Sequence, residues 1–340
     1  MMSSARFTLL TAGLSMAAGV ASLPAQPAQN AAPARYFKGN LHTHTLNSDG
    51  DSTPDDVVRW YRERGYNFVT LTDHNYLTSV DGLNALHGAD DKFIVMKGEE
   101  VTDRFGDKPV HLNGFAPTAF IKPPGGKSVL DMAQKMIDAI RASGAVPSVN
   151  HPNYGWAISA DELLHLQRTR LFEVFNGHPL VNNAGGGGLP GLEDVWDRML
   201  SSGKMIYGIA VDDAHYFKRP EDPAAPRPGQ GWVYVKAPRL ESRALVGALE
   251  RGDFYSSTGV ELTSVNATSR DLSVTVKPAG QSKYRIQFIG KQGAVLSEST
   301  DSSATYTFKG DESYVRARVI ESNGKMAWVQ PVPVGRTAPK

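Results

Sequence analysis

The 340-residue sequence contains no cysteine. A disulfide framework and a lipid-carrying N-terminal cysteine are therefore excluded, and any metal ion has to be bound by histidine and carboxylate side chains. A surplus of one charge is lacking too, since 36 lysines and arginines stand against 35 aspartates and glutamates. This balance argues against a protein that binds nucleic acid through a basic face.

Long hydrophobic runs are also absent. The candidate, from Phe7 to about Val20, is too short to span a bilayer comfortably. It follows Arg6 and precedes small residues, which is the order of a secretory signal peptide. We therefore expect a signal peptide over residues 1–22, a flexible leader over residues 23–35, and a periplasmic or secreted protein. A buried N-terminal helix is the alternative.

From about Tyr36 to Thr258, short apolar runs alternate with amphipathic segments. The segment TPDDVVRWYRERG is typical of the helices, with Thr53 as N-cap and Gly65 as terminator. The runs YNFVTLT, KFIVMKG, AVPSVN, LFEVF, MIYGIAV and GWVYVKA are expected to be strands. About seven such repeats predict an α/β fold, a parallel β/α barrel over residues 36–260.

After about Glu261 the pattern changes. Short β-rich runs such as LSVTVKPAG, YRIQFIG and SYVRARVIE are separated by Gly, Asn, Asp and Ser. This texture predicts a small all-β, sandwich-like domain over residues 261–335.

Histidines and acids gather at the ends of the expected strands. His42 and His44 follow a strand at positions i and i+2, so both point to the same side and form a pair able to bind one divalent ion. A pair of surface histidines is the alternative. The other candidate ligands are Asp49, His74, Glu100, His111, His151, Asp213 and His215. Because the carboxyl ends of barrel strands meet at one face, the sequence predicts a metal centre there.

The order of these motifs resembles the polymerase and histidinol phosphatase (PHP) superfamily of metallohydrolases. The motifs are His42-Thr43-His44, Asp49, Asp73-His74, Gly98-Glu99-Glu100, His111, His151-Pro152 and Asp213-Ala214-His215. The flanking phrases GEEVT, EVFNG and FYSSTG are similar to the exported, CehA/McbA-like branch, whose members also carry a small β domain. The resemblance implies that the larger domain is a distorted (β/α)7 PHP barrel.

The resemblance also implies two or three divalent ions, and the imidazole and carboxylate donors suit Zn, Mn or Fe. It places His42, His44, Glu100 and Asp213 around one ion, Asp49, His74 and His215 around a second, and His111 and His151, with a bridging Glu100, around a third. Hydrolysis by a metal-bound hydroxide would then involve Glu100 and His215. Asp73 would orient His74 or handle a proton, and a helix cap at Asp73 is the alternative.

Other side chains are candidates for substrate binding. Asn176, together with Glu173, is expected on the catalytic face, where it orients ligands or substrate or packs at a strand end. Tyr154 would form a pocket wall or pack as an ordinary aromatic residue. Arg104 would grip a phosphate or stay solvated in its loop, and His178 is expected in a loop and not as a ligand.

These observations predict an exported metal-dependent phosphoesterase that hydrolyses a phosphomonoester or phosphodiester of a small molecule, lipid or nucleotide. A carbamate, ester or amide hydrolase on the same metal site is a second hypothesis, because a fold does not decide the reaction. A non-catalytic metal- or glycan-binding protein is a third. Cations that face the metals would favour phosphate, and an apolar wall would favour a carbamate or ester.

Overall fold

The structure is a computed structural model that describes Met1 and residues 33–335. The expected signal peptide, apart from Met1, and most of the expected leader lie outside the described residues. From Pro33 onward the chain forms one compact unit. Within the part of the chain that the structure describes, no helix is long and apolar enough to cross a membrane.

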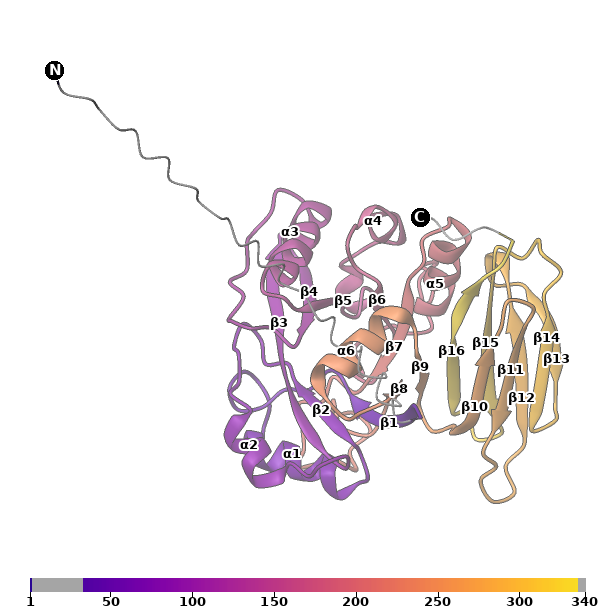
Figure 1. Ribbon diagram of the computed structural model, residues 1–340, viewed down its shortest axis with the longest axis horizontal. Helices are drawn as coiled ribbons and strands as arrows, with labels where there is room; N and C mark the ends of the chain where they lie inside the picture. Colours follow the sequence, from indigo (N-terminus) through magenta and orange to yellow (C-terminus); the bar gives the residue numbers. More distant parts are fainter. Residues whose placement is uncertain (2–32, 336–340) are drawn as a thin grey trace. The chain divides into compact units, whose positions relative to one another are not determined.

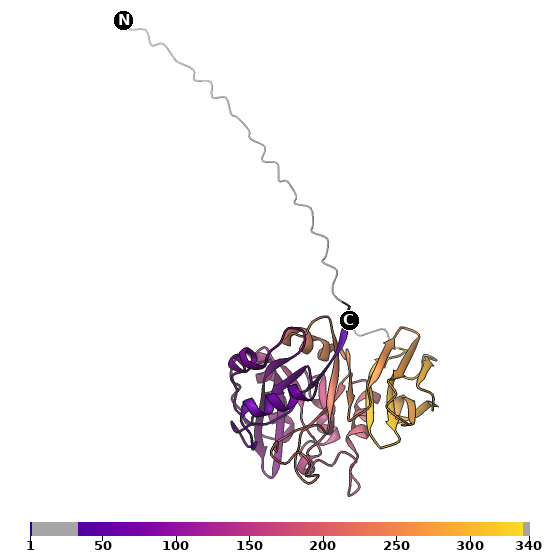
Figure 2. The ribbon, with the colours of Figure 1, turned by 90° about the horizontal axis from the view of Figure 1, so that it is seen from below.

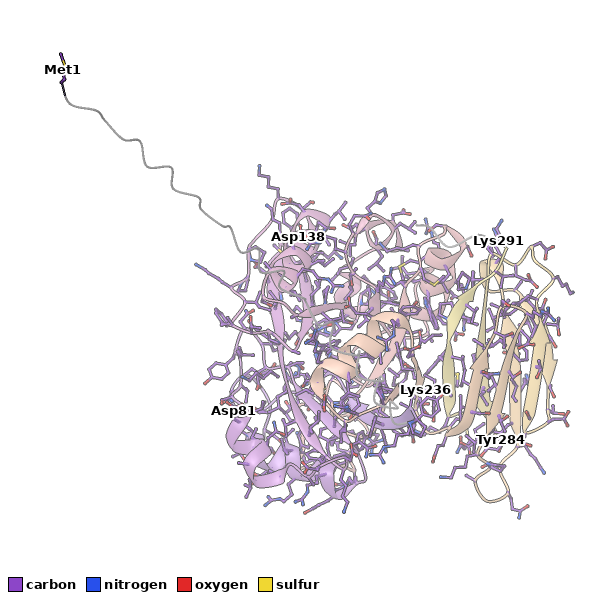
Figure 3. The ribbon with its side chains drawn as sticks, in the orientation of Figure 1. Met1, Asp81, Asp138, Lys236, Tyr284 and Lys291 are labelled. Atoms are coloured by element: carbon purple, nitrogen blue, oxygen red, sulfur yellow. The ribbon has the colours of Figure 1, made fainter. Side chains whose placement is uncertain are left out.

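Helices form where the sequence supplies a cap and an apolar face. In α1 (Pro54–Glu63), the Thr53 side chain accepts a hydrogen bond from the backbone N–H of Asp56, and Val57 and Tyr61 are buried. The other helices are α2 (Asp81–His87), α3 (Val129–Ala142), α4 (Ala160–His165), α5 (Leu192–Ser201) and α6 (Ser242–Arg251), with short 3₁₀ turns η1 (Tyr154–Trp156) and η2 (Lys291–Gly293). Figure 1 shows α1, α2 and α3 outside the strands, and in Figure 3 the labelled Asp81 and Asp138 lie on α2 and α3 at the outer surface.

The larger part of the molecule is built on one curved sheet. Its strands are β1 (Arg35–Asn40), β2 (Phe68–Leu71), β3 (Ile94–Phe105), β4 (Lys108–Phe115), β5 (Val146–Val149), β6 (Leu171–Asn176), β7 (Tyr207–Val211), β8 (Trp232–Ala237) and β9 (Phe254–Ser257). They are neighbours in the order β9-β8-β1-β2-β3-β4-β5-β6-β7. An isolated bridge joins Thr43, after β1, to Ala214, after β7. The segments that follow these two strands therefore meet, although β1 and β7 are not neighbours in the sheet.

The α/β class is confirmed, but the regular parallel barrel is not. Strands β1, β2 and β3 pair in parallel, as do β5, β6 and β7. Strand β4 runs antiparallel to both β3 and β5, and β8 runs antiparallel to β1. Only Gly106 and Asp107 connect β3 to β4. A parallel crossover needs about a dozen residues or more, so these two strands have to form a hairpin.

The interior of the curved sheet is filled from every strand between β1 and β8. The buried cluster contains, in strand order, Phe37, Phe68, Met96, Phe115, Val146, Leu171, Ile209 and Val235. These apolar side chains form the floor of the interior. The polar residues at the strand ends, which include the predicted ligands, lie outside this apolar cluster.

Strands β10 to β16 form a second, all-β domain, which Figures 1 and 2 show in orange to yellow. Its strands are β10 (Leu262–Ala267), β11 (Asp271–Val276), β12 (Tyr284–Ile289), β13 (Val295–Ser299), β14 (Ser303–Thr307), β15 (Tyr314–Glu321) and β16 (Met326–Pro333). Strands β10, β11 and β14 make one sheet, while β13, β12, β15 and β16 continue the large sheet through the pairing of β16 with β9. Val274, Phe288 and Val319 belong to a core shared by both sheets.

Candidate metal centre

The structure brings all nine predicted ligands together. His42 and His44 follow β1, His74 follows β2, Glu100 lies in β3 and His111 in β4. His151 follows β5, Asp213 and His215 follow β7, and Asp49 lies in the loop after β1. Four overlapping groups of these side chains place their donor atoms within 4.8 Å of one another. Residues as far apart in the sequence as His42 and His215 therefore belong to one polar cluster.

One set of close contacts joins His42, His44, Glu100 and Asp213. Nε2 of His42 lies 3.2 Å from Oε2 of Glu100 and 3.2 Å from Oδ1 of Asp213. Nε2 of His44 lies 3.3 Å and 3.1 Å from the same two oxygens. Donor atoms that surround a tetrahedral ion at about 2.0–2.1 Å are separated by about 3.3 Å. The four histidine–carboxylate distances therefore match those between ligands of one ion.

The hydrogen bonding of the cluster points to the same conclusion. Nε2 of His42, Oε2 of Glu100 and Nδ1 of His111 are buried and have no hydrogen-bond partner within the described residues. Leaving such atoms unsatisfied costs about 1–3 kcal/mol each. Divalent cations bound on the two sides of Glu100 would satisfy all three, so the residues present fit metal ions.

Two further groups adjoin the first. Asp49 lies between two imidazoles. Its Oδ2 is 3.5 Å from Nε2 of His74, and its Oδ1 is 3.4 Å from Nε2 of His215. On the other side, Oε1 of Glu100 lies 3.2 Å from Nδ1 of His111 and 3.4 Å from Nε2 of His151. The two carboxylate oxygens of Glu100 thus face different groups, as those of a bridging ligand would.

Partners behind the ligands determine which ring nitrogen faces the centre. Nδ1 of His42 lies 2.6 Å from Oε1 of Glu173, and Nδ1 of His215 lies 2.9 Å from the backbone carbonyl oxygen of Asp213. A histidine that donates from Nδ1 keeps its Nε2 lone pair for a cation. Both rings are therefore held with Nε2 toward the cluster.

Glu173 and Asn176, both in β6, support the ligands from behind. Oε2 of Glu173 accepts hydrogen bonds from the backbone N–H of His151 at 2.7 Å and from Nδ2 of Asn176 at 2.8 Å. The same Asn176 amide nitrogen lies 3.1 Å from Oδ2 of Asp213. Asn176 does not line the pocket described below. Of the roles expected for Asn176, these contacts fit the orientation of ligands and not contact with substrate.

The charges of the cluster shift the pKa values of its members. Burial opposes ionisation of Glu100, but His74 and the other nearby histidines hold the pKa of its carboxyl well below the usual range. Burial likewise opposes ionisation of Asp213, but His42 and the other nearby histidines together outweigh it, so the pKa of this carboxyl also lies well below normal. Burial and the neighbouring imidazoles lower the pKa of His44 to about 3. Anionic carboxylates are the form that binds a metal ion. Despite burial, the carboxylates of the cluster raise the pKa of His42, of His151 and, to about 9, of His215, so a metal ion has to displace the protons of these three rings.

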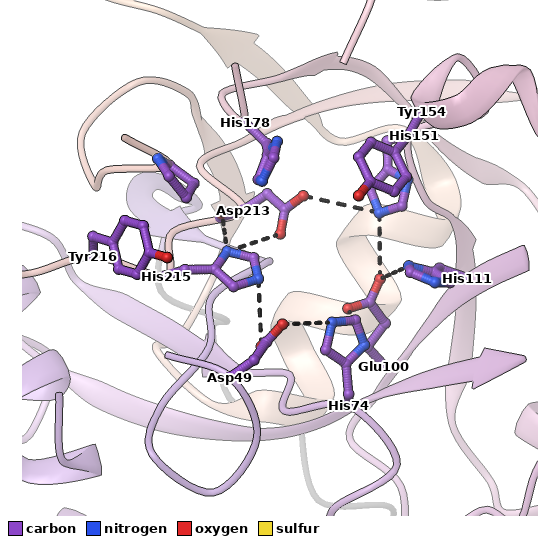
Figure 4. Close-up of a pocket in the computed structure, with 11 residues that line it drawn as sticks. Asp49, His74, Glu100, His111, His151, Tyr154, His178, Asp213, His215 and Tyr216 are labelled. Atoms are coloured by element: carbon purple, nitrogen blue, oxygen red, sulfur yellow. Dashed lines mark hydrogen bonds and ion pairs between the residues drawn. The ribbon is translucent and has the colours of Figure 1, made fainter. Parts of the chain in front are cut away.

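A pocket of about 260 Å³ opens over the cluster (Figure 4). Its lining residues are Asp49, His74, Glu100, His111, His151, Tyr154, His178, Asp213, His215, Tyr216 and Pro226. Among the described residues, no lysine or arginine lines it. Tyr154 stands in the wall, where the sequence suggested it, so any substrate would meet the metal ligands on one side and neutral side chains on the other.

Arg104, predicted to bind substrate, lies away from the pocket. It is near the exposed end of β3, and its guanidinium donates a hydrogen bond to the backbone carbonyl oxygen of Asp107 at 3.1 Å. The expectation of a ligand-binding loop between Glu100 and His111 is not met, because that segment is a β-hairpin whose turn projects beyond the cluster.

Asp73 is buried next to the ligands but does not reach the pocket. Its carboxylate accepts hydrogen bonds from the backbone N–H of Thr45 at 2.7 Å and from the hydroxyls of Ser48 at 2.8 Å and Thr78 at 2.6 Å. No helix begins at Asp73, which disposes of the alternative of a cap. Asp73 instead fixes the loop that carries Asp49.

The same loop depends on a glycine. A Cβ atom at Gly50 would lie 2.7 Å from the backbone carbonyl carbon and oxygen of His44. Only glycine allows this approach, which brings Asp49 back over the cluster.

Three residues near the centre were not expected there. His178 and Tyr216 line the pocket, and Oγ1 of Thr102 lies 2.6 Å from Nδ1 of His74. The sequence offered one indication for each pocket residue: His178 comes two residues after Asn176, and Tyr216 directly follows His215. Neither has a spacing that identifies it, because both lie in irregular loops.

Neither a protein-family model nor a curated protein matches the sequence. The similarity lies in the fold. A solved two-domain protein of Bacteroides vulgatus ATCC 8482, described as containing a predicted PHP-like metal-dependent phosphoesterase, aligns with 84% of this chain and 90% of its own, at 14% identity and a TM-score of 0.50. The chain has a PHP-like fold. The expectation of this fold from the order of the motifs is thereby confirmed.

Two other solved structures align over shorter parts. A Bifidobacterium adolescentis ATCC 15703 protein, thought to be a metal-dependent phosphoesterase, aligns with 56% of this chain and 89% of its own, at 14% identity and a TM-score of 0.40. The lesion-specific endonuclease PfuEndoQ of Pyrococcus furiosus aligns with 64% of this chain and 56% of its own, at 16% identity and a TM-score of 0.41.

Proposed function

We propose that the protein is a metal-dependent hydrolase, and specifically a phosphoesterase that cleaves a phosphomonoester or phosphodiester. The observation that carries the proposal is that Nε2 of His42 and Nε2 of His44 each lie 3.1 to 3.3 Å from one oxygen of Glu100 and one oxygen of Asp213. The PHP-like fold supports it, since the Bacteroides protein is described as containing a metal-dependent phosphoesterase.

The proposed site holds two or three divalent ions, of Zn, Mn or Fe. The first would be held by His42, His44, Glu100 and Asp213, the second by Asp49, His74 and His215, and the third by His111, His151 and Glu100, as the close contacts within each set suggest. Such ions, when bound, activate water for hydrolysis at neutral pH and neutralise charge that develops on the scissile group.

The remaining roles belong to the chain itself. Glu100 and His215 line the pocket, which supports a place for both beside the reacting group. Asp73 acts as a positioning residue, because its hydrogen bonds go to the loop that carries Asp49.

One observation favours a second candidate, the hydrolysis of a carbamate, ester or amide. Among the described residues, no lysine or arginine lines the pocket. The described part of the site therefore lacks the cationic side chains that would favour binding of a phosphate group. An uncharged carbonyl substrate can bind without cationic side chains. The lining is polar, however, and lacks the apolar wall that would favour this second class.

Three broader features belong to the same proposal. We propose that residues 36–260 form a distorted (β/α)7 barrel, which the shared interior of β1 to β8 supports. Residues 261–335 would be a separate β domain, which the common core of its two sheets supports. Export through a signal peptide over residues 1–22 rests on the sequence alone.

The test is a substrate panel assayed with protein loaded with Mn, Zn or Fe. Phosphomonoesters, phosphodiesters, carboxyl esters, amides and carbamates are compared before and after chelation. Phosphoester turnover that requires the metal supports the first candidate, and turnover of the carbonyl compounds alone supports the second. Metal binding without any hydrolysis favours the non-catalytic alternative. His42→Ala should lose activity, whereas His165→Ala, at an exposed position of α4, should keep it.

A further inference from the structure

His178 stands in the pocket wall beside the metal ligands (Figure 4). It belongs to the segment that follows β6, and its ring makes edge contacts with two other lining residues. The ring centroids lie 5.6 Å from that of His215 and 5.7 Å from that of Tyr154. None of the three proposed ligand groups includes His178. It is therefore a histidine of the site without a metal to bind.

Two hydrogen bonds hold His178 in place. Its backbone N–H donates to Oδ1 of Asn176 at 2.8 Å, and its Nδ1 accepts from the backbone N–H of Leu180 at 3.2 Å. The side-chain amide of Asn176 also contacts the ligand Asp213 at 3.1 Å. The position of His178 is thus coupled to the position of the proposed metal centre.

These contacts also select the tautomer. Because Nδ1 accepts a hydrogen bond, the neutral ring carries its proton on Nε2. Within residues 33–335, no group accepts a hydrogen bond from this Nε2–H, and none is bonded to the hydroxyl of Tyr154 or of Tyr216. All three residues line the pocket. Three neutral donor groups therefore surround the opening, free to bind an acceptor.

An oxygen-rich substrate group needs such donors. Its oxygens that do not face the ions have no lysine or arginine in the pocket lining to bind to, so neutral donors have to bind them. Donors that are already held in position need little reorganisation when the substrate binds. Their hydrogen bond to an oxygen becomes stronger when that oxygen gains negative charge. Of the three, His178 is fixed by hydrogen bonds on both its backbone and its ring.

We infer that His178 is a substrate-binding residue, whose Nε2–H donates a hydrogen bond to an oxygen of the group that is cleaved. The inference rests on the proposed function, in which that group is a phosphoryl. It assigns substrate recognition to a neutral histidine, in place of the cationic Arg104 that the sequence suggested.

The experiment uses the full chain loaded with Mn and four proteins: the wild type, His178→Ala, His178→Gln and the control His165→Ala. Glutamine places an N–H near the position of the histidine Nε2, so it should restore what alanine removes. Three quantities are measured: bound Mn, the Kd of inorganic phosphate by calorimetry, and kcat and KM on the best substrate of the panel.

We expect His178→Ala to weaken phosphate binding and to lower kcat/KM by about tenfold or more, as for one hydrogen bond to a charged group. His178→Gln should recover most of this loss, His165→Ala should match the wild type, and bound Mn should be equal in all four. Unchanged phosphate affinity in His178→Ala overturns the inference, as does a loss that follows lost Mn. A wild type that binds no phosphate also overturns it.

The outcomes separate this inference from the proposed function. Suppose that the wild type hydrolyses no substrate, and that His178→Ala still weakens phosphate binding. The hydrolase proposal then fails and the binding role of His178 stands. If the wild type is active and His178→Ala has the same activity and the same phosphate affinity, the hydrolase proposal stands and the binding role of His178 fails.

Discussion

Oε1 of Glu173 lies 2.6 Å from Nδ1 of His42, and both side chains are fully buried. The other oxygen of the same carboxylate accepts a hydrogen bond from the backbone of His151. One buried acid therefore aligns two predicted ligands from different strands. An acid in this position fixes the tautomer of the histidine and makes its second nitrogen a stronger ligand.

Glu173→Gln is expected to lower the affinity for divalent metal by about ten- to a hundredfold. The amide keeps the shape of the side chain but removes the charge that stabilises the His42 ring. Titration calorimetry with Mn or Zn measures the effect. Glu63→Gln, an exposed position on α1, is the matched control. Equal affinity in Glu173→Gln and the control would show that Glu173 has only a packing role.

Asp213 combines a ligand with an unusual backbone. Its φ is 51°, in the left-handed region that asparagine tolerates better than alanine. Asp213→Asn should therefore lose metal binding while keeping the fold. Asp213→Ala should also lose metal binding and be less stable than Asp213→Asn by about 1 kcal/mol. Urea unfolding of both metal-free variants measures the difference, and an Ala variant at least as stable as the Asn variant would contradict it.

The second domain is joined to the first through a buried ion pair. Nε and Nη2 of Arg316 in β15 lie 2.7 Å and 2.6 Å from the two carboxylate oxygens of Asp197 in α5. The hydroxyl of Tyr314 donates to the same carboxylate at 2.8 Å. Removing Asp197 breaks both of these contacts and the hydrogen bond of Tyr314, and it leaves the buried guanidinium of Arg316 with Glu193 as its remaining charged partner, 2.8 Å away.

Asp197→Ala is accordingly expected to lower the free energy of unfolding by about 3–5 kcal/mol. Asp161→Ala is the matched control, because Asp161 pairs with Arg198 at the exposed surface, where an ion pair contributes about 0–1 kcal/mol. Denaturant unfolding of the metal-free proteins gives both values. Similar losses in the two variants would disprove the structural role of the buried pair.

Glu193 gives the fold a dependence on acid pH. Burial opposes its ionisation, but Arg316 and Arg318 outweigh this effect and lower the pKa of its carboxyl below 4.5. A depressed pKa in the folded state stabilises the protein above the pKa of the unfolded chain, and the contribution is lost as the pH falls through the folded value. Glu193→Gln should therefore be less stable than the wild type at pH 7.

The difference between Glu193→Gln and the wild type should shrink as the pH is lowered from about 5 toward the folded pKa. Urea unfolding at a series of pH values checks this, with Glu63→Gln as the control whose difference stays near zero. A stability difference that is constant from pH 7 to pH 3 would mean that the charge of Glu193 does not matter.

The sequence by itself determined what depends on neighbours along the chain. The cap of α1, the alternation of strand and helix, and the pair His42 and His44 at positions i and i+2 all follow from local rules of backbone geometry. The order of the candidate ligands was enough to predict the PHP-like fold. Apart from this order, which runs from His42 to His215, each of these features is set within a few residues.

The tertiary structure alone decided which of these residues meet. Glu173 reaches His42 across 131 positions of sequence, and no spacing rule covers such a distance. The two-residue turn between β3 and β4 moved Arg104 away from the site, and packing of strand ends brought His178 into it. Contacts of this kind depend on how strands curve around a shared interior, since side chains far apart in the chain become neighbours only once that interior has formed.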